Sequence, residues 1–72
     1  MKDERFDKEL GYALRAEREK QQLTQQQVAD RLGVSKMAVS NWESGNRSMY
    51  ASTFRDYCKV LGVTMSYIVS KI

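Results

Sequence analysis

Apolar residues along the chain recur at intervals of three and four positions, and nowhere do they alternate regularly with polar ones. This spacing is typical of amphipathic α-helices and argues against strands. Five helical segments follow from it, at about 3–21, 24–32, 35–43, 51–61 and 65–70. Because the connections between them are short, we expect an all-α fold, a compact bundle of five short helices.

Residues with capping chemistry mark where three of these helices begin. Thr24 and Gln27 are spaced as a capping box, in which each side chain accepts a hydrogen bond from the other residue's backbone N–H. Ser35 and Thr64 are expected as N-caps of the third and fifth helices, because a short hydroxyl side chain accepts from a backbone N–H of the first turn.

Glycines mark where helices end. Gly33, Gly45 and Gly62 each follow a periodic apolar segment, and glycine readily adopts the left-handed conformation of a helix C-cap. The start of the fourth helix has two candidate N-caps, Ser48 and Ser52, and the sequence does not decide between them.

The inward faces of the five helices predict the core. Its expected members are Phe6, Leu10, Ala13 and Leu14, with Glu17 on the same face, and then Val28, Ala29, Leu32, Val34, Val39, Trp42, Phe54, Tyr57, Cys58, Leu61 and Ile68. Trp42 has an alternative role, stacking on a base, but its helical spacing with Val39 favours a place in the core. Cys58 is expected as a small buried apolar residue.

Composition limits the chemistry that the chain can carry. Its 72 residues predict one domain over 1–72. One Cys and no His exclude an internal disulfide and the usual zinc sites, so we expect no metal and no cofactor. Without His, a Cys–His pair or a Gly-rich phosphate loop, we expect no catalytic residue and no enzymatic activity.

The charge and the hydropathy of the chain limit the kinds of partner and the cellular location that we expect. The net charge is +3, and residues 1–20 hold six basic and six acidic residues, whereas residues 21–72 hold six and three. This distribution suits a polyanion partner, although a chance imbalance on a soluble surface is the alternative. No apolar run approaches the ~18 residues of a membrane span, and no signal peptide is evident. A lone Cys fits a reducing cytoplasm better than a secreted context.

Residues 23–45 carry the pattern that indicates function. Ala29 is small enough for the third helix to cross close over the second, and Gly33 permits the sharp turn between them. The result is a pair of short helices at a steep angle, joined by a turn of three to four residues.

With these residues in view, the sequence resembles the lambdoid phage repressor and Cro family, the XRE-type helix-turn-helix proteins. The resemblance extends from about Leu10 to Val69. Its most specific parts are Leu23-Thr24-Gln25, Ala29, Leu32-Gly33-Val34-Ser35, Val39-Ser40, Trp42-Glu43, Gly45, Leu61-Gly62-Val63-Thr64 and Tyr67-Ile68. The chain departs from the family in lacking the proline that many members carry before the fourth helix.

The resemblance implies that the third helix lies in the major groove of duplex DNA, with its first residues at the base edges. Lys36 is expected at guanine, Met37 and Ala38 at a thymine methyl group, Asn41 at adenine or a phosphate, and Ser40 near the edge of this surface. The chain adds a physical hint, because Lys36 opposes the helix dipole and Met37 has no inward place. A solvated lysine beside a packed methionine is the alternative.

Phosphate contacts are expected around the base-contacting helix. The resemblance assigns one to Gln25, at the start of the second helix, where backbone N–H groups attract an anion. Ser35 is a second candidate, although capping is its simpler role. Asn46 and Arg47 follow the third helix in a loop that is expected to approach the DNA backbone.

The resemblance also implies a salt bridge between Arg18 and Glu43 that fixes the third helix on the first. Two exposed charges of little energetic weight are the alternative. The structural residues expected around the motif are Arg18, Ala29, Gly33, Val39, Trp42 and Glu43.

One helix reads only a few base pairs, so related proteins bind DNA as dimers, with half-sites about 10 bp apart. We therefore expect a homodimer on a pseudo-palindromic operator. Its candidate contact residues are Met65, Val69 and Ile72, with Tyr50 or Met49 from the loop. An antitoxin-type protein, whose main partner is another protein, is the alternative function. The sequence does not decide between a Cro-like regulator and the DNA-binding part of a longer repressor.

Overall fold

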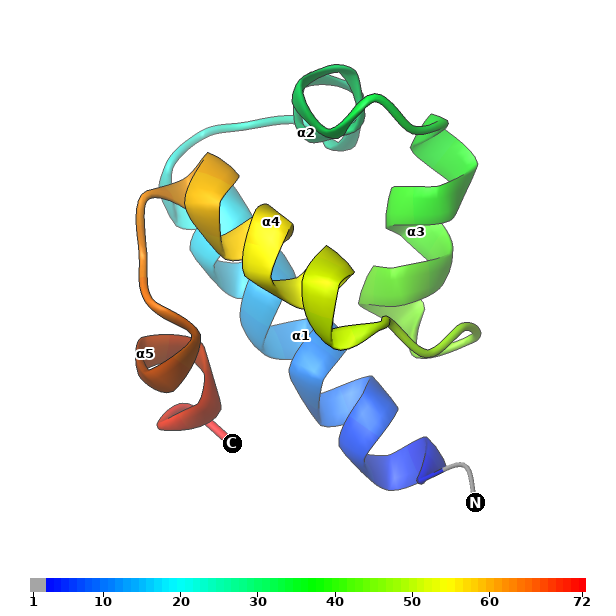
Figure 1. Cartoon of the computed structure of the whole chain (residues 1–72), viewed down its shortest axis with the longest axis vertical. Helices are drawn as coiled ribbons and strands as arrows, with labels where there is room; N and C mark the ends of the chain where they lie inside the picture. The colour runs from blue at the N-terminus through cyan, green and yellow to red at the C-terminus, as the bar shows by residue number, and fades with distance from the viewer. Residues whose placement is uncertain (1–2) are drawn as a thin grey trace.

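A computed structural model describes residues 3–72, and all of the regular structure in that range is helical (Figure 1). The helices are α1 (Glu4–Lys20), α2 (Gln25–Leu32), α3 (Lys36–Ser44), α4 (Ala51–Leu61) and α5 (Met65–Val69). The predicted all-α class is confirmed, and each helix boundary lies within about one residue of its predicted place. None of these helices is long and apolar enough to cross a lipid bilayer.

The long helix α1 is the support for the other elements. It packs against α3, α4 and α5, while α2 packs against α3 and α4. In Figure 1, α3 and α5 lie on opposite sides of the molecule, with α1 and α4 between them. The bundle therefore presents α3 and α5 on separate faces.

The core lies where the inward faces of all five helices meet. Its buried members are Leu10, Ala13, Leu14, Val28, Ala29, Val39, Trp42, Phe54, Tyr57, Cys58, Leu61 and Ile68. Leu32 and Val34 are half-buried at its edge. Phe6 was predicted on the inward face but is 40% exposed, because the first turns of α1 extend past the neighbouring helices (Figure 1).

The local signals for helix ends act as predicted. Thr24 and Gln27 form both hydrogen bonds of the capping box, and Ser35 accepts from the backbone N–H of Ala38. Thr64 caps α5 in the same way. Glycines 33, 45 and 62 occupy the C-caps of α2, α3 and α4 with φ of 70°, 79° and 68°.

The start of α4 differs from both expectations. Its N-cap is Tyr50, which makes no side-chain capping hydrogen bond. Ser52 lies inside the first turn of the helix, and the hydroxyl of Ser48 donates instead to Oδ2 of Asp7 at 2.6 Å. A serine that reaches an aspartate 41 residues away in sequence is not available as a local cap.

A close approach of α1 and α3 depends on Gly11. This glycine is buried in the middle of α1, facing the last turns of α3. A Cβ atom built there would lie 2.5 Å from the backbone carbonyl oxygen of Glu43, and even closer to that of Trp42. Only a hydrogen atom fits between the two backbones at this crossing.

We predict that Gly11→Ala destabilises the protein although it improves the intrinsic helix propensity of α1. Alanine favours a helix by about 1 kcal/mol over glycine, but the added methyl group must push α3 away, at a typical overpacking cost of about 1–3 kcal/mol. Urea unfolding followed by circular dichroism measures the difference. The reverse change at an exposed site of the same helix, Ala16→Gly, is the control and is expected to cost about 1 kcal/mol. An unchanged or raised unfolding midpoint for Gly11→Ala would contradict the close approach.

Candidate nucleic-acid interface

The segment from α2 to α3 forms a helix-turn-helix. Gly33, in the left-handed conformation, ends α2, and Ser35 caps α3 directly afterwards. Val28 and Ala29 of α2 and Val39 of α3 are fully buried, so the two helices share one packed wedge. This wedge fixes α3 at an angle to α2, and the side of α3 that faces away from the wedge is open to solvent.

The N-terminal end of α3 protrudes from the bundle. Lys36 is exposed and the Met37 side chain is 72% exposed. Ala38, Ser40 and Asn41 are half-buried beside them. An exposed apolar side chain next to a lysine at a helix tip is a surface suited to contact with a partner.

The residues predicted to hold phosphates lie at the starts of α2 and α3 and in the loop after α3. Gln25 is the first residue of α2, and its side-chain amide donates to Oε1 of Glu43 at 3.1 Å. Arg47 is exposed, and its backbone N–H donates to the carbonyl oxygen of Asn41 at 3.2 Å. These two bonds place the start of α2 and the loop after α3 against α3 itself. Asn46 is exposed in the same loop.

Ser35 is used in the protein as a cap. Its hydroxyl oxygen accepts from the backbone N–H of Ala38 at 3.1 Å, while its hydroxyl hydrogen remains available to an acceptor outside the chain. Capping and a phosphate contact are therefore compatible at this residue.

Arg18 and Glu43 form a buried ion pair, as the resemblance implies. Nε and Nη2 of Arg18 donate to the two oxygens of Glu43 at 2.7 and 2.9 Å. The Glu43 side chain is only 2% exposed. Arg18 also donates from Nη1 to the carbonyl oxygen of Leu23 at 2.7 Å, which fixes the connection between α1 and α2.

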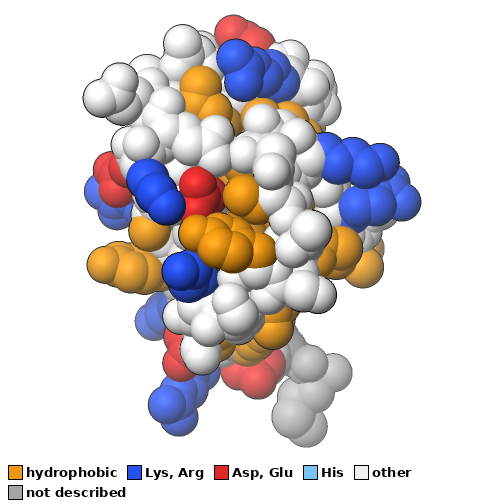
Figure 2. Space-filling view, turned by 90° about the vertical axis from the view of Figure 1, so that its left-hand side faces the viewer, with side chains coloured by type: hydrophobic (Ala, Val, Ile, Leu, Met, Phe, Trp, Pro, Cys, Tyr) orange, Lys and Arg blue, Asp and Glu red, His pale blue; other side chains and the backbone are white. Residues whose placement is uncertain are grey.

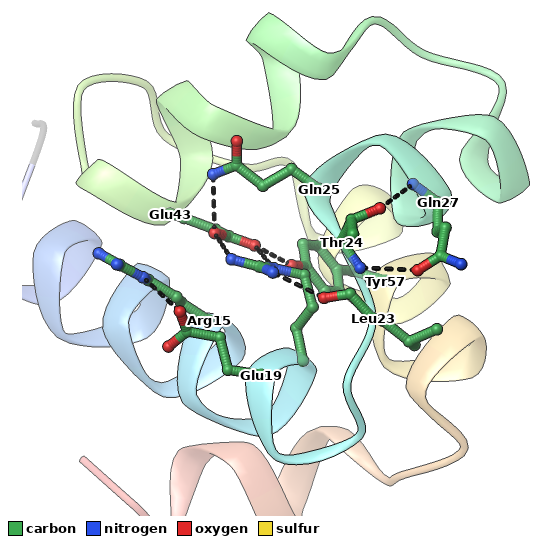
Figure 3. Close-up of polar contacts among 9 residues, drawn as sticks. Arg15, Glu19, Leu23, Thr24, Gln25, Gln27, Glu43 and Tyr57 are labelled. Carbon is green, nitrogen blue, oxygen red and sulfur yellow. Dashed lines mark hydrogen bonds and ion pairs between the residues drawn. The ribbon is translucent and has the colours of Figure 1, made fainter.

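Two further donors complete the surroundings of this carboxylate (Figure 3). The Tyr57 hydroxyl of α4 donates to Oε2, and the Gln25 amide of α2 donates to Oε1. We call the group formed by Arg18, Leu23, Gln25, Glu43 and Tyr57 the Glu43 cluster. It joins α1, α2, α3 and α4 at one point. Among residues 3–72, no buried side-chain nitrogen or oxygen lacks a hydrogen-bond partner.

The Glu43 cluster holds a fixed pattern of charge. Burial alone would raise the pKa of Glu43, but the hydrogen bonds from Arg18, Tyr57 and Gln25 outweigh it and leave that pKa below its ordinary value. Hydrogen bonding to Glu43 raises the pKa of Arg18. Burial, together with the adjacent carboxylate, raises the pKa of Tyr57. At neutral pH the cluster therefore holds one anion, one cation and a neutral phenol.

The sequence interpretation missed three members of the cluster. It did not foresee that the carbonyl oxygen of Leu23 accepts from Arg18. Tyr57 was expected only as core, and Gln25 only as a phosphate contact. A signal for Tyr57 was present, because a buried tyrosine hydroxyl nearly always requires a partner.

We predict that Glu43→Gln destabilises the protein by about 3–5 kcal/mol at pH 7, because it leaves Arg18 as an unpaired buried cation. A group whose folded-state pKa is depressed stabilises the fold above its unfolded pKa, and that contribution disappears as pH falls through the folded pKa. The stability gap between the wild type and Glu43→Gln should therefore shrink below about pH 4. Denaturant titrations between pH 3 and pH 7 measure this gap.

Two variants serve as references for this experiment. Tyr57→Phe removes one hydrogen bond to the carboxylate and is expected to cost about 1.5–3 kcal/mol. Glu9→Gln removes an exposed partner of Arg5 and is expected to cost less than about 1 kcal/mol. A gap that does not change with pH would show that Glu43 is not held as an anion.

Comparisons with known proteins agree with this geometry. A family model described as helix-turn-helix matches residues 14–68. No curated protein sequence matches the chain. Two crystal structures of the clp gene regulator ClgR from Corynebacterium glutamicum are similar, each with a TM-score of 0.88 and 25% identity. The match covers 90% of this chain and 84% or 69% of the respective ClgR chain. The chain belongs to the helix-turn-helix family of DNA-binding regulators, and within it to the XRE type.

Proposed function

We propose that the protein is a sequence-specific regulator of transcription that binds an operator in duplex DNA, in the manner of phage or prophage repressors and Cro. The observation that carries this proposal is the protruding tip of α3, where Lys36 and Met37 are exposed. The likeness to ClgR, which is described as a gene regulator, supports a role in transcription. Its place of action would be the cytoplasm of a bacterial or phage-infected cell.

In this proposal the first turns of α3 read the bases. Lys36 donates to O6 and N7 of guanine, and Met37 and Ala38 contact a thymine methyl group. Asn41 pairs with N6 and N7 of adenine or binds a phosphate, and Ser40 lies at the edge of the contact. Each good base contact contributes about 1–3 kcal/mol of discrimination.

Phosphate contacts set the register of the protein on the duplex. The side-chain amide of Gln25 has two hydrogens, and Glu43 takes only one of them, so the second can reach a phosphate. Ser35, Asn46 and Arg47 supply the other contacts. Such contacts increase affinity for any sequence and place α3 over the bases.

Two copies bind a pseudo-palindromic operator, with half-sites about 10 bp apart. Exposed apolar residues near the C-terminal end support a contact between the copies, since Val69 is 46% and Ile72 41% exposed. Met65 is half-buried beside them. Tyr50, 83% exposed, and the half-buried Met49 provide a second apolar surface in the loop before α4.

We predict that Lys36→Ala and Asn41→Ala each relax the sequence preference at one base position per half-site, because each removes one direct contact. Selection of bound duplexes from a random library, with the wild type and both variants in parallel, measures the preference. The same selection reports operator symmetry and half-site spacing. Lys59→Ala, an exposed change on α4, is the control and should leave the selected sequence unchanged. Unaltered preferences in both α3 variants would refute the assignment.

We predict that Arg47→Ala weakens binding to all duplexes about equally and lowers the slope of log affinity against log salt concentration by about one, as expected for one lost phosphate contact. Fluorescence anisotropy with a selected and a scrambled duplex, between low and physiological salt, measures both quantities. A loss confined to the selected duplex would assign Arg47 to base reading instead. A protein-only module would show no salt-dependent binding to either duplex.

A further inference from the structure

The side of the molecule opposite α3 carries a groove between α1 and α5. Figure 2 looks onto this side and shows hydrophobic side chains in its middle, with Lys and Arg side chains and some acidic side chains around them. Tyr12 and Tyr67 line the groove, together with the buried Ile68. Lys20, Lys71 and Glu17 complete the lining.

The aromatic walls offer an anchor for an apolar side chain. Tyr12, a large aromatic residue of α1, is 72% exposed. Tyr67 is half-buried, and the ammonium group of Lys71 lies 4.8 Å from the centre of its ring. The groove encloses about 310 Å³, at the small end of ligand pockets, which suits one bulky side chain rather than a whole cofactor.

The two lysines at this groove form no ion pair within residues 3–72 and share the groove with one carboxylate, that of Glu17. The ion pairs formed among residues 3–72 use Arg5, Arg15, Arg18 and Arg55, and neither Lys20 nor Lys71 takes part in one. The nearby carboxylate of Glu17 accepts a hydrogen bond from the Gln21 amide at 2.9 Å. Lys20 and Lys71 are therefore available to carboxylates from outside the chain.

We propose that this groove docks an acidic peptide segment of a partner protein. One bulky apolar side chain of the segment inserts between Tyr12 and Tyr67, while neighbouring Asp or Glu residues pair with Lys20 and Lys71. Glu17 then accepts a backbone N–H of the segment.

A peptide fits this groove better than a second stretch of DNA. The hydrogen bond from Gln21 is the main reason why the pKa of Glu17 lies below its ordinary value. The positive charges of the nearby Lys20 and Lys71 lower this pKa further. The ionised carboxylate of Glu17 can accept a hydrogen bond from a peptide backbone N–H, a donor that a DNA backbone lacks. The groove also lies away from α3, because α5, which forms one of its walls, is on the opposite side of α1 from α3 (Figure 1).

The groove leaves the proposed DNA surface accessible, together with Met65 and Val69 of the proposed dimer contact, whereas Ile72 lies next to Tyr12 and Lys71 in the adjoining hollow. On α5, Tyr67 is two residues from Met65 and from Val69, which at 100° per residue places it about 200° around the helix from each. A regulator bound to its operator can therefore hold a partner on this face at the same time.

The test uses the full chain labelled with ¹⁵N and a synthetic ten-residue peptide in which five acidic residues alternate with leucine and phenylalanine. We expect saturable amide shifts around Tyr12, Lys20 and Tyr67, with little change in α3. A peptide with amides in place of the acids, and one with alanine in place of the apolar residues, should each bind at least tenfold more weakly. Equal binding of either control peptide, or no shift at millimolar peptide, would overturn the proposal.

A pair of charge-reversal variants separates a specific site from general attraction. Lys20→Glu with Lys71→Glu should weaken binding of the acidic peptide at least tenfold. Arg31→Glu with Lys59→Glu changes the net charge equally and should change the affinity less than threefold. Both double variants lower the net charge by the same amount and should lose general attraction to DNA to a similar extent. Duplex binding is measured separately at low salt, so that failure of the groove and failure of DNA binding remain distinguishable. Duplex DNA that shifts the groove residues instead of α3 would identify this face as a nucleic-acid surface and overturn the peptide assignment.

Discussion

The orientation of α3 depends on how one buried carboxylate is satisfied. Glu43 accepts hydrogen bonds from Arg18, Gln25 and Tyr57, which belong to the three helices around it. A buried ion pair contributes little net stability compared with an apolar replacement, but it is costly to break. Its effect is therefore mainly geometric, because any displacement of α3 would separate charges inside the protein. The helix α3 has nine residues, and only three of them are buried. Its apolar contacts therefore define its orientation only in part, and the ion pair of Glu43 with Arg18 defines the rest.

Gln25 connects this interior constraint to the outer surface. One hydrogen of its amide is held by Glu43, so the side chain has a fixed direction before any ligand arrives. A group held in advance loses less conformational entropy on binding than a mobile one. Together with Gly11, which brings the backbones of α1 and α3 into close approach, this contact links the surface proposed to bind phosphates to the rigid part of the bundle.

The features that the sequence predicted well are those with local causes. The capping box of Thr24 and the cap at Ser35 depend on residues three positions apart, so α2 and α3 could be placed from sequence alone. The start of α4 could not, because Ser48 bonds to Asp7 across the fold. The roles of Gly11 and Tyr57 could not be predicted either. The close helix crossing at Gly11 and the buried hydrogen bond of Tyr57 exist only where segments distant in sequence meet. The resemblance supplied the one long-range contact that was foreseen, between Arg18 and Glu43.

The division of the molecule into two faces follows from the same packing. The helix α1 packs against α3 on one side and α5 on the other (Figure 1). Its residues between Gly11 and Lys20 therefore contribute side chains to both sides. Arg18 is turned inward to the Glu43 cluster, whereas Glu17 and Lys20 face the groove beside α5. The shared element is one continuous helix, in which three nitrogen atoms of Arg18 form hydrogen bonds to Glu43 and Leu23. A partner in the proposed groove and a duplex at the proposed DNA surface would therefore lie on opposite sides of the same helix, each beside side chains that α1 supplies.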